Sequence, residues 1–400
     1  MINSETFRCG RGIIAGLVIS VGVSAAFAQI NPAVMPASGP ISKQTMSRLL
    51  LTDATRVGDR VVAVGDRGYI VYSDNNGESW QRAKTPPNTP LLTAVYFLDA
   101  KTGWAVGHDS MILTSTDRGE SWTKSFSAVE EQKPLMHVTF VDAQTGFAVG
   151  AYGAFHATTD GGKTWAPRKL FEGAKAAAAP AAAQKKGKYE SVGSSKGGAT
   201  KGGKGDEGDA DEKAGKGGGD DDKHINTIVK LGENKLFVAG EAGLLAKSDN
   251  GGKSWTKIAS PYKGSYFGAI QAQDGGVVIY GLRGRIYRST DATLSNWKQI
   301  DNKSVASLMG STRLADGTLA LAGLSVTVLV SKDNGNSFSV VASGSTKALS
   351  APLPGAANKL LLIGEAGVRE ISLATVAPVP AAAATPAAPA AAPAANKPKS

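Results

Sequence analysis

A repeat of just over forty residues is the feature that most constrains the fold of this 400-residue chain. In seven places a serine or threonine follows a glycine eight residues later. The pairs are Gly65/Ser73, Gly107/Ser115, Gly150/Thr158, Gly240/Ser248, Gly281/Ser289, Gly323/Ser331 and Gly364/Ser372. Successive glycines lie 41 to 43 residues apart, except for one gap of 90 residues that holds an insertion. Four strands of about five residues and their turns need about forty residues, so this period fits a propeller blade.

Each repeat has the same internal order of strands and turns. An apolar strand precedes the glycine, as in residues 61–64 (VVAV), and a second leads into the serine, as in residues 69–72 (YIVY). A polar hairpin follows and ends in an aromatic residue, most clearly in residues 115–122 (STDRGESW). Short, evenly spaced strands with frequent turn signals exclude a helical solenoid. The sequence therefore predicts an all-β fold, a seven-bladed β-propeller of four-stranded blades.

Six of the seven repeats contain a hairpin that resembles the Asp box of bacterial neuraminidase (BNR) repeats, S-x-D-x-G-x-[ST]-[WF]. We expect its role to be structural, because the aspartate and serine can bond turn amides and the glycine adopts an angle that other residues resist. The closing aromatic ring should be buried between adjacent sheets. The residues assigned to this role are Trp80, Asp117, Trp122, Asp160, Trp165, Trp255, Trp297, Asp333 and Phe338. Asn75 and Asn250 replace the aspartate in two boxes, and residues 289–297 contain one extra residue.

The seventh repeat stops at Ser372, without a hairpin or a tryptophan. Closing the ring would remove the exposed sheet edge that promotes aggregation. Residues 33–36 (AVMP) follow the pattern seen after each tryptophan. We therefore expect residues near 33–40 to form the outermost strand of blade seven, so that the N-terminal strand closes the ring.

The propeller, expected at residues 29–375, is flanked and interrupted by segments of different composition. A positive segment, an apolar run and the sequence AFA at residues 26–28 predict a signal peptide at residues 1–28, with cleavage after Ala28. A retained N-terminal anchor is the alternative. Residues 172–223, between blades three and four, and the Ala/Pro-rich residues 376–400 are predicted to be disordered. The protein is therefore expected in the periplasm or outside the cell.

The chain does not show the residue patterns that catalysis would require. Its net charge of +10 is spread along the sequence, which argues against a nucleic-acid-binding module. The four histidines fall at unrelated positions and predict no metal site, and the one cysteine, Cys9, lies in the predicted signal peptide. A sialidase needs three arginines, a tyrosine and carboxylates in one pocket, and its usual R-I-P segment is missing. We therefore expect no enzymatic activity, no cofactor and no metal.

The turns after the repeat glycines should lie on one face of the ring and the Asp boxes on the other. This arrangement places Arg67, His108, Tyr152, Glu241, Arg283 and Glu365 on one face, together with the insertion. Arginines of blades one, five and seven could form a basic patch there for acidic segments of a partner. The residues assigned to this partner-binding patch are Arg67, Arg283, Arg285, Arg288 and Arg369. The alternative is that they are ordinary turn residues in solvent.

The repeated units, VG-x-x-G-x-[IL]-x-x-[ST]-x-D-x-G-x-[ST]-W, and the sequence T-G-[WF]-A-V-G at residues 102–107 and 145–150 resemble the photosystem II assembly and stability factor family. The resemblance covers residues 57–373 without the insertion. It implies a lumenal or periplasmic propeller that binds membrane-protein intermediates without catalysing a reaction. We therefore expect a monomeric binding scaffold for a membrane-protein complex or its assembly intermediates, without nucleic acid or a small-molecule substrate. The alternative is a secreted glycan-active propeller, either a sialidase-like glycosidase or a lectin.

Overall fold

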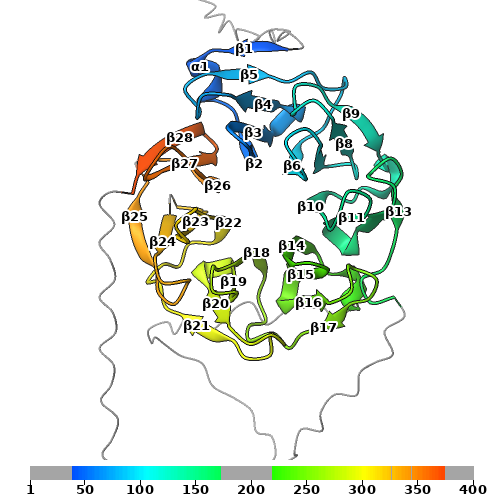
Figure 1. Cartoon of the computed structure of the whole chain (residues 1–400), viewed down its shortest axis with the longest axis vertical. Coiled ribbons are helices and arrows are strands. Elements are labelled where there is room, and N and C mark those ends of the chain that lie inside the picture. The colour runs from blue at the N-terminus through cyan, green and yellow to red at the C-terminus, as the bar shows by residue number, and fades with distance from the viewer. Residues whose placement is uncertain (1–37, 173–218, 326, 344, 374–400) are drawn as a thin grey trace, which may run out of the picture. The chain divides into compact units, whose positions relative to one another are not determined.

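The computed structural model describes residues 38–172, 219–325, 327–343 and 345–373. These residues form seven antiparallel sheets arranged in a ring (Figure 1). The prediction of a seven-bladed propeller built from four-stranded blades is therefore confirmed. Within the described ranges, helices are limited to α1 (Lys43–Met46) and short 3-10 turns. No helix in this part of the chain is long and apolar enough to span a membrane.

The strands follow one another from the centre of the ring outward in every blade. Blade one contains β2 (Leu51–Val57), β3 (Arg60–Gly65), β4 (Ile70–Ser73) and β5 (Trp80–Arg82). Blades two and three contain β6 (Leu92–Phe97), β7 (Gly103–Gly107), β8 (Ile112–Ser115), β9 (Thr123–Phe126), β10 (Leu135–Phe140), β11 (Gly146–Gly150), β12 (Phe155–Thr158) and β13 (Ala166–Pro167). Blades four and five contain β14 (Ile225–Gly232), β15 (Lys235–Gly240), β16 (Leu245–Ser248), β17 (Thr256–Lys257), β18 (Tyr266–Gln271), β19 (Val277–Gly281), β20 (Ile286–Ser289) and β21 (Lys298–Ile300). Blades six and seven contain β22 (Leu308–Arg313), β23 (Leu319–Gly323), β24 (Thr327–Ser331), β25 (Ser339–Ala342), β26 (Leu349–Pro354), β27 (Lys359–Gly364) and β28 (Gly367–Ser372).

The glycine that defines the repeat occupies a position where the first and second strands approach each other closely. In all seven blades the first strand has a β-bulge near its start. A Cβ atom on Gly65 would lie 2.1 Å from the carbonyl oxygen of Leu50, and the other six repeat glycines would meet the equivalent oxygen at 2.1 to 2.3 Å. That oxygen also accepts a hydrogen bond from the amide after the glycine, as from Asp66 N–H to Leu50 at 3.0 Å. Only glycine leaves room for this contact.

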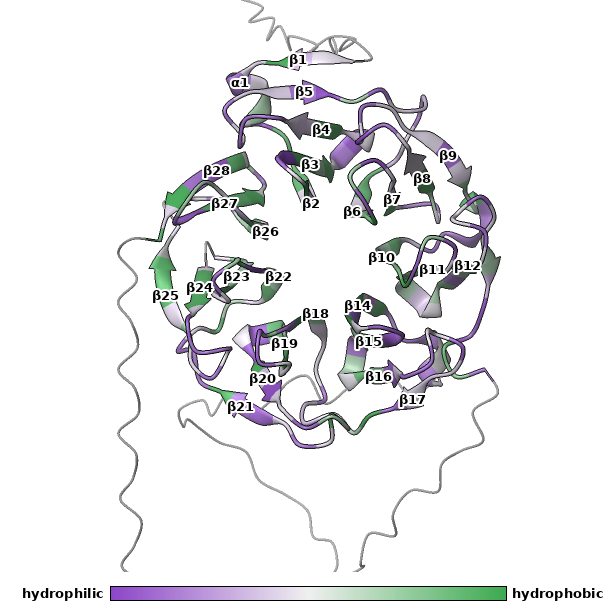
Figure 2. Ribbon diagram, viewed as in Figure 1, coloured by the Kyte–Doolittle hydropathy of each residue, from purple (hydrophilic) through white to green (hydrophobic). Residues whose placement is uncertain are grey.

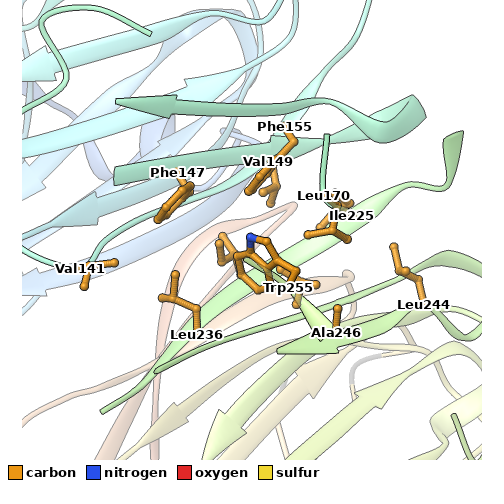
Figure 3. Close-up of a cluster of buried hydrophobic side chains, with 12 residues drawn as sticks. Val141, Phe147, Val149, Phe155, Leu170, Ile225, Leu236, Leu244, Ala246 and Trp255 are labelled. Carbon is orange, nitrogen blue, oxygen red and sulfur yellow. The ribbon is translucent and has the colours of Figure 1, made fainter. Parts of the chain in front are cut away.

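The hydrophobic core lies between the blades, because each sheet is covered on both faces by its neighbours. Every residue of the second strand is buried in blades one, two, three, five and six. Figure 2 shows apolar residues concentrated on strands and polar residues in turns and hairpins. Trp104 and Phe147 pack between blades, since both are buried and Trp104 stacks on Phe140 of blade three with ring centroids 3.6 Å apart. Trp255 of blade four likewise meets Phe147 and Phe155 of blade three edge-on (Figure 3).

The hairpin between the third and fourth strands is held together by its own side chains. Ser115 Oγ accepts a hydrogen bond from Gly119 N–H at 2.9 Å and donates one to Asp117 Oδ1 at 2.8 Å. Asp117 Oδ1 also accepts a bond from Ser121 N–H at 3.0 Å. Trp122 Nε1 donates to the Gly119 carbonyl at 3.0 Å, and its ring is buried between blades one and two. The hairpin therefore links local turn geometry to packing between blades.

Two departures from the hairpin pattern keep its geometry by other means. Asn75 and Asn250 stand in for aspartate and accept the same backbone bond, from Ser79 and Ser254 N–H, at 3.0 Å in both cases. In blade five, the hairpin with the extra residue places Leu294 at a φ of 57°. Leu294 is buried in the cluster between blades four and five, so its packing offsets an angle that is unfavourable for leucine.

A Cβ atom on five of the hairpin glycines would meet a side chain of the preceding blade in the ring. The pairs, with the hairpin glycine first and the side chain of the preceding blade second, are Gly77–Leu361, Gly119–Val62, Gly162–Trp104, Gly252–Phe147 and Gly335–Val278. Each side chain in these pairs comes from a second strand. The hairpin glycine is therefore part of the interface between blades as well as part of a turn.

The prediction that an N-terminal strand completes blade seven is wrong for the residues that the structure describes. β1 (Gly39–Ile41) pairs with β5 at the outer edge of blade one, and blade seven has three strands in the described ranges (Figure 1). Blade seven packs directly on blade one instead, with a hydrogen bond from Ser350 Oγ to the Leu51 carbonyl at 3.0 Å and Met46 of α1 in the shared core. The outer edges of both blades offer the same backbone groups to a strand. The sequence pattern therefore predicts a strand here but not its partner.

The predicted signal peptide (1–28), the predicted tail (376–400) and residues 173–218 of the insertion lie outside the described residues. The last part of the insertion forms a 3-10 turn, η4 (Asp220–Asp222). Asp220 lies 3.0 Å from Lys223 and also pairs with Lys257 of β17. The ion pair with Lys257 attaches the end of the insertion to blade four.

Candidate functional site: a partner-binding face and a central channel

The two faces of the ring carry different parts of each blade. Adjacent strands are antiparallel, so the turns between second and third strands lie on the same face as the connections into each first strand. We call this the glycine-turn face; its turns are residues 65–68, 107–110, 150–153, 240–243, 281–284, 323–325 and 364–367. The hairpins between third and fourth strands lie on the opposite face, which we call the hairpin face.

Exposed large apolar side chains gather on the glycine-turn face. Those on its turns and connections are Leu50, Val129, Tyr152, Val305 and Leu324. Two more complete the set in the described part of the chain: Met309, at the adjoining end of the central channel, and Val340, on the outermost strand of blade six. None of the seven lies on the hairpin face. Several apolar side chains exposed to water on the same face mark a candidate interaction surface.

Three of these apolar residues, Val305, Met309 and Leu324, belong to blade six or to the connection into it. Val305 is 86% exposed and Leu324 is 43% exposed. The Ser307 carbonyl accepts a hydrogen bond from Leu324 N–H at 2.9 Å, which holds the connection carrying Val305 against the turn. Arg283 N–H donates to Ser307 Oγ at 3.3 Å, so an arginine of blade five borders the same residues. We call Arg283, Val305, Met309 and Leu324 the blade-six patch.

The five arginines predicted to bind a partner do not form one cluster. Arg67 and Arg283 occupy equivalent turn positions on the glycine-turn face, in blades one and five, with φ values of 52° and 56°. Arg285 lies beside Arg283 at the start of β20, with its guanidinium carbon 6.0 Å from the centre of the Tyr262 ring. Arg369 is exposed on β28, at the outer rim of blade seven. The positive groups are thus divided between two separate parts of this side of the ring.

Arg288 lies elsewhere, because it is near the hairpin end of β20. Its side chain is buried, donates to the Asn334 carbonyl at 2.7 Å and forms an ion pair with Asp274. These contacts join blades five and six on the hairpin side. Arg288 therefore has a structural role and does not contribute to a partner-binding patch.

The structure also adds a basic residue that the repeat pattern did not reveal. A pocket of about 360 Å³ beside α1 is lined by Arg48, Arg67, Leu50, Tyr69 and other residues. Arg48 follows α1 and precedes the first repeat, so it has no counterpart in the other blades. The pocket combines two arginines with an exposed leucine on the glycine-turn face.

The second candidate site is the central channel. A cavity of about 580 Å³ is lined by residues from the first strands of all seven blades, together with Tyr280 of β19. It lies toward the glycine-turn face, because the lining includes the bulge residues at the start of each first strand. Polar bulge side chains join neighbouring blades there: Thr52 donates to the Leu92 carbonyl at 2.6 Å, and Thr93 donates to the Leu135 carbonyl at 2.6 Å.

Two titratable residues of the channel were not singled out from the sequence. Asp53 and His137 occupy the same position in β2 and β10, two residues after the leucine that begins the strand. Burial raises the pKa of Asp53 to about 7, against hydrogen bonds from backbone amides that lower it. Burial lowers the pKa of His137 to about 4, and its Nδ1 has no hydrogen-bond partner. Their shared register is the sequence signal that could have revealed them.

The described lining of the channel does not provide a sialidase site. It contains one carboxylate, Asp53, and one tyrosine hydroxyl, Tyr280, and no arginine. Tyr280 donates its hydroxyl to Ser311 Oγ at 2.9 Å, and burial raises its pKa. In the described ranges, no group of three or more His, Cys, Asp or Glu is arranged to hold a metal ion.

Fold and site geometry define this protein as a seven-bladed β-propeller with an apolar, partly basic face and a central channel lined by polar and apolar residues. No protein-family model and no curated protein matches the chain. Among solved structures, it is similar to YCF48 bound to a D1 peptide, with 14% identity, a TM-score of 0.58, and 84% of this chain and 97% of that chain covered. YCF48 from Cyanidioschyzon merolae gives 15% identity, a TM-score of 0.57 and coverage of 83% and 97%. The GH74 enzyme of Niastella koreensis shares 14% identity with a TM-score of 0.56, and the match covers 85% of this chain and 55% of that chain.

At such identities these similarities establish the fold and nothing further. The same architecture carries both a propeller bound to a peptide and an enzyme. Function must therefore be argued from the residues of this chain.

Proposed function

We propose that this protein is a non-catalytic scaffold outside the cytoplasm that binds a segment of a membrane protein or of its assembly intermediates on the glycine-turn face. The observation that carries the proposal is the gathering of exposed apolar side chains on that face and their absence from the described hairpin face. Exposed apolar groups lose contact with water when a partner covers them, which favours binding.

The blade-six patch has the composition of a peptide-binding surface. Val305 and Leu324 supply apolar area, and Arg283 lies at their border. An arginine beside an apolar surface favours a segment with apolar side chains and a carboxylate. The similarity of the fold to YCF48 bound to a D1 peptide supports a peptide as ligand. The sequence resemblance to photosystem II assembly and stability factors points to the same class of partner.

A glycan-binding role is the competing proposal, favoured by a cleft on blade five that also borders the connection from blade four and the hairpin of blade six. The cleft has a volume of about 760 Å³ and is lined by Trp297, Asn296, Asn336 and other polar residues. A partly buried indole beside amide groups can hold a sugar ring against its accessible edge. No carboxylate is among the residues that line the cleft, whereas glycoside hydrolysis needs two. This surface therefore supports a lectin better than a glycosidase.

The two proposals differ in the residues they need. In the first experiment, the tagged protein captures membrane proteins from detergent-solubilised membranes of its source, and captured proteins are identified by mass spectrometry. We expect capture of a defined integral membrane protein and at least a tenfold loss with the double variant Val305→Asp and Leu324→Asp. Val340→Asp is the matched control, because Val340 is exposed to a similar degree on the outer strand of the same blade.

Equal capture by the double variant and the control would refute binding on the glycine-turn face. The glycan proposal is tested separately on a glycan array with the wild type and Trp297→Ala. Binding that depends on Trp297, together with no membrane-protein capture, would replace the scaffold proposal with a lectin.

A further inference from the structure

The central channel contains a buried negative group without a positive partner. Asp53 is the only carboxylate in the described channel lining, and that lining contains no lysine or arginine. The hydrogen bond from Val95 N–H to Asp53 Oδ2, at 2.9 Å, joins it to the neighbouring blade. A second backbone hydrogen bond comes from Ala54, but neither bond supplies a positive charge, so the carboxylate stays without a cationic partner. A carboxylate withdrawn from water strongly favours a bound cation or a proton.

The groups around Asp53 favour an organic cation over a metal ion. The neutral imidazole of His137 and the hydroxyls of Tyr280 and Ser311 lie in the same lining. The remaining lining includes the apolar side chains of Met136, Phe267 and Met309. A calcium ion needs six or more oxygen ligands, which this lining does not concentrate in one place. An ammonium or guanidinium group on an apolar body needs one carboxylate, a few neutral acceptors and apolar walls.

The size and position of the cavity also suit such a ligand. A volume of about 580 Å³ is within the range of small-molecule sites. The bulge residues Thr52 and Met309 place the cavity toward the glycine-turn face. It is therefore on the side from which either a free small molecule or a side chain of a docked segment would enter.

We propose that the channel binds a primary ammonium or guanidinium group, held by the carboxylate of Asp53, with the attached carbon chain packed against Met136, Phe267 and Met309. The source of the group is either a free organic amine or a lysine or arginine side chain of a peptide. The site shares Met309 with the blade-six patch, but Asp53 lies outside that patch, and the existence of the channel site does not depend on the function proposed for the patch.

Binding of a cation through Asp53 must compete with protonation of the same carboxylate. The titratable groups in the described channel lining are Asp53, His137 and Tyr280. His137 is neutral at pH 6 to 8, because burial lowers its pKa to about 4, and Tyr280 is neutral because burial raises its pKa. Asp53, with a pKa raised to about 7 by burial, therefore controls the pH dependence. The ionised fraction falls about tenfold from pH 8 to pH 6, and the apparent affinity should fall by the same factor.

The test is isothermal titration calorimetry of the full chain with two pairs of probes. The first pair is pentylamine and the neutral 1-pentanol. The second pair is the acetylated and amidated peptides Gly-Lys-Gly and Gly-Gln-Gly. We expect at least one charged probe to bind while its neutral counterpart does not, with an affinity about tenfold higher at pH 8 than at pH 6. Binding of pentylamine or of the lysine peptide tells which source the channel accepts.

The variant Asp53→Asn separates a binding role from a structural one. Asparagine keeps an oxygen that can accept the Val95 N–H bond but carries no charge, so the variant should fold and lose at least tenfold in affinity. A wild-type measurement gives a second readout: at pH 6.5, binding should release protons, seen as a dependence of the heat on the ionisation enthalpy of the buffer. No binding by either charged probe, or unchanged affinity in Asp53→Asn, or binding without proton release would each overturn the proposal.

Discussion

Gly162 shows how a turn residue can hold two blades together. It stands at the glycine position of the blade-three hairpin with a φ of 80°, an angle at which alanine costs about 1–2 kcal/mol. A Cβ atom there would also lie 2.3 Å from Nε1 of Trp104 in blade two. Trp104 is 1% exposed and stacks on Phe140, so its ring has no room to move away. Overpacking of this kind adds about 1–3 kcal/mol.

Gly77 is the matched control at the same position of the blade-one hairpin. Its φ is 90°, so alanine meets the same backbone penalty. A Cβ atom there would lie 3.5 Å from the Trp80 ring and 3.6 Å from Leu361, which are ordinary contacts. We therefore predict that Gly162→Ala lowers the free energy of unfolding by about 1–3 kcal/mol more than Gly77→Ala does.

The prediction is measured by guanidinium chloride unfolding followed by far-UV circular dichroism, with both variants in the wild-type and Trp104→Leu backgrounds. Removing the indole should abolish the excess cost of Gly162→Ala and leave the cost of Gly77→Ala unchanged. Equal costs for the two glycines in the wild type, or an excess that persists without the indole, would show that the clash with Trp104 is not the cause.

Three further predictions concern stability. Burial lowers the pKa of His156, and neither ring nitrogen has a hydrogen-bond partner, so the unfolded chain binds more protons below pH 6.5 and the folded state loses stability on acidification. His156→Phe should therefore reduce the loss of stability between pH 7 and pH 5 in urea unfolding, and an unchanged loss would contradict this. Asp53 gives the opposite pH dependence: because its pKa is raised to about 7, its contribution to stability is present below pH 4 and is lost as the pH rises through 7. Asp53→Asn should therefore be more stable than the wild type at pH 8 and not at pH 4. Arg60 is buried and forms ion pairs with Asp74 and Glu120 at 2.7 and 3.0 Å, and both carboxylates are half-exposed. We therefore expect Arg60→Met to lower the free energy of unfolding by only about 1–2 kcal/mol in thermal or denaturant unfolding. A change near zero would mean that these ion pairs do not join blades one and two.

Much of the candidate binding face follows from the repeat. The turn position of Arg67 and Arg283 was predictable because equal spacing from the repeat glycine gives equal positions in each blade. The direction of Arg288 was not predictable, because a buried ion pair with Asp274 depends on the neighbouring turn and hairpin. Exposure of Val305 and Leu324 was also hidden, since an apolar residue in a connection is exposed only if no other segment covers it.

The sequence by itself determined the number of blades, the strands and the hairpins, because each is specified by residues that are close in the chain and occur with a regular period. Only the tertiary structure decided which sheet edge β1 joins, since blades one and seven offer equivalent backbone groups. It also decided which residues meet in the channel, since Asp53, His137 and Tyr280 come from different blades. It also explained the repeat glycine itself. The period could be read directly from the chain, but the reason for the glycine could not. A carbonyl oxygen at the start of the first strand lies where a Cβ atom would be, and this contact exists only once the two strands are side by side.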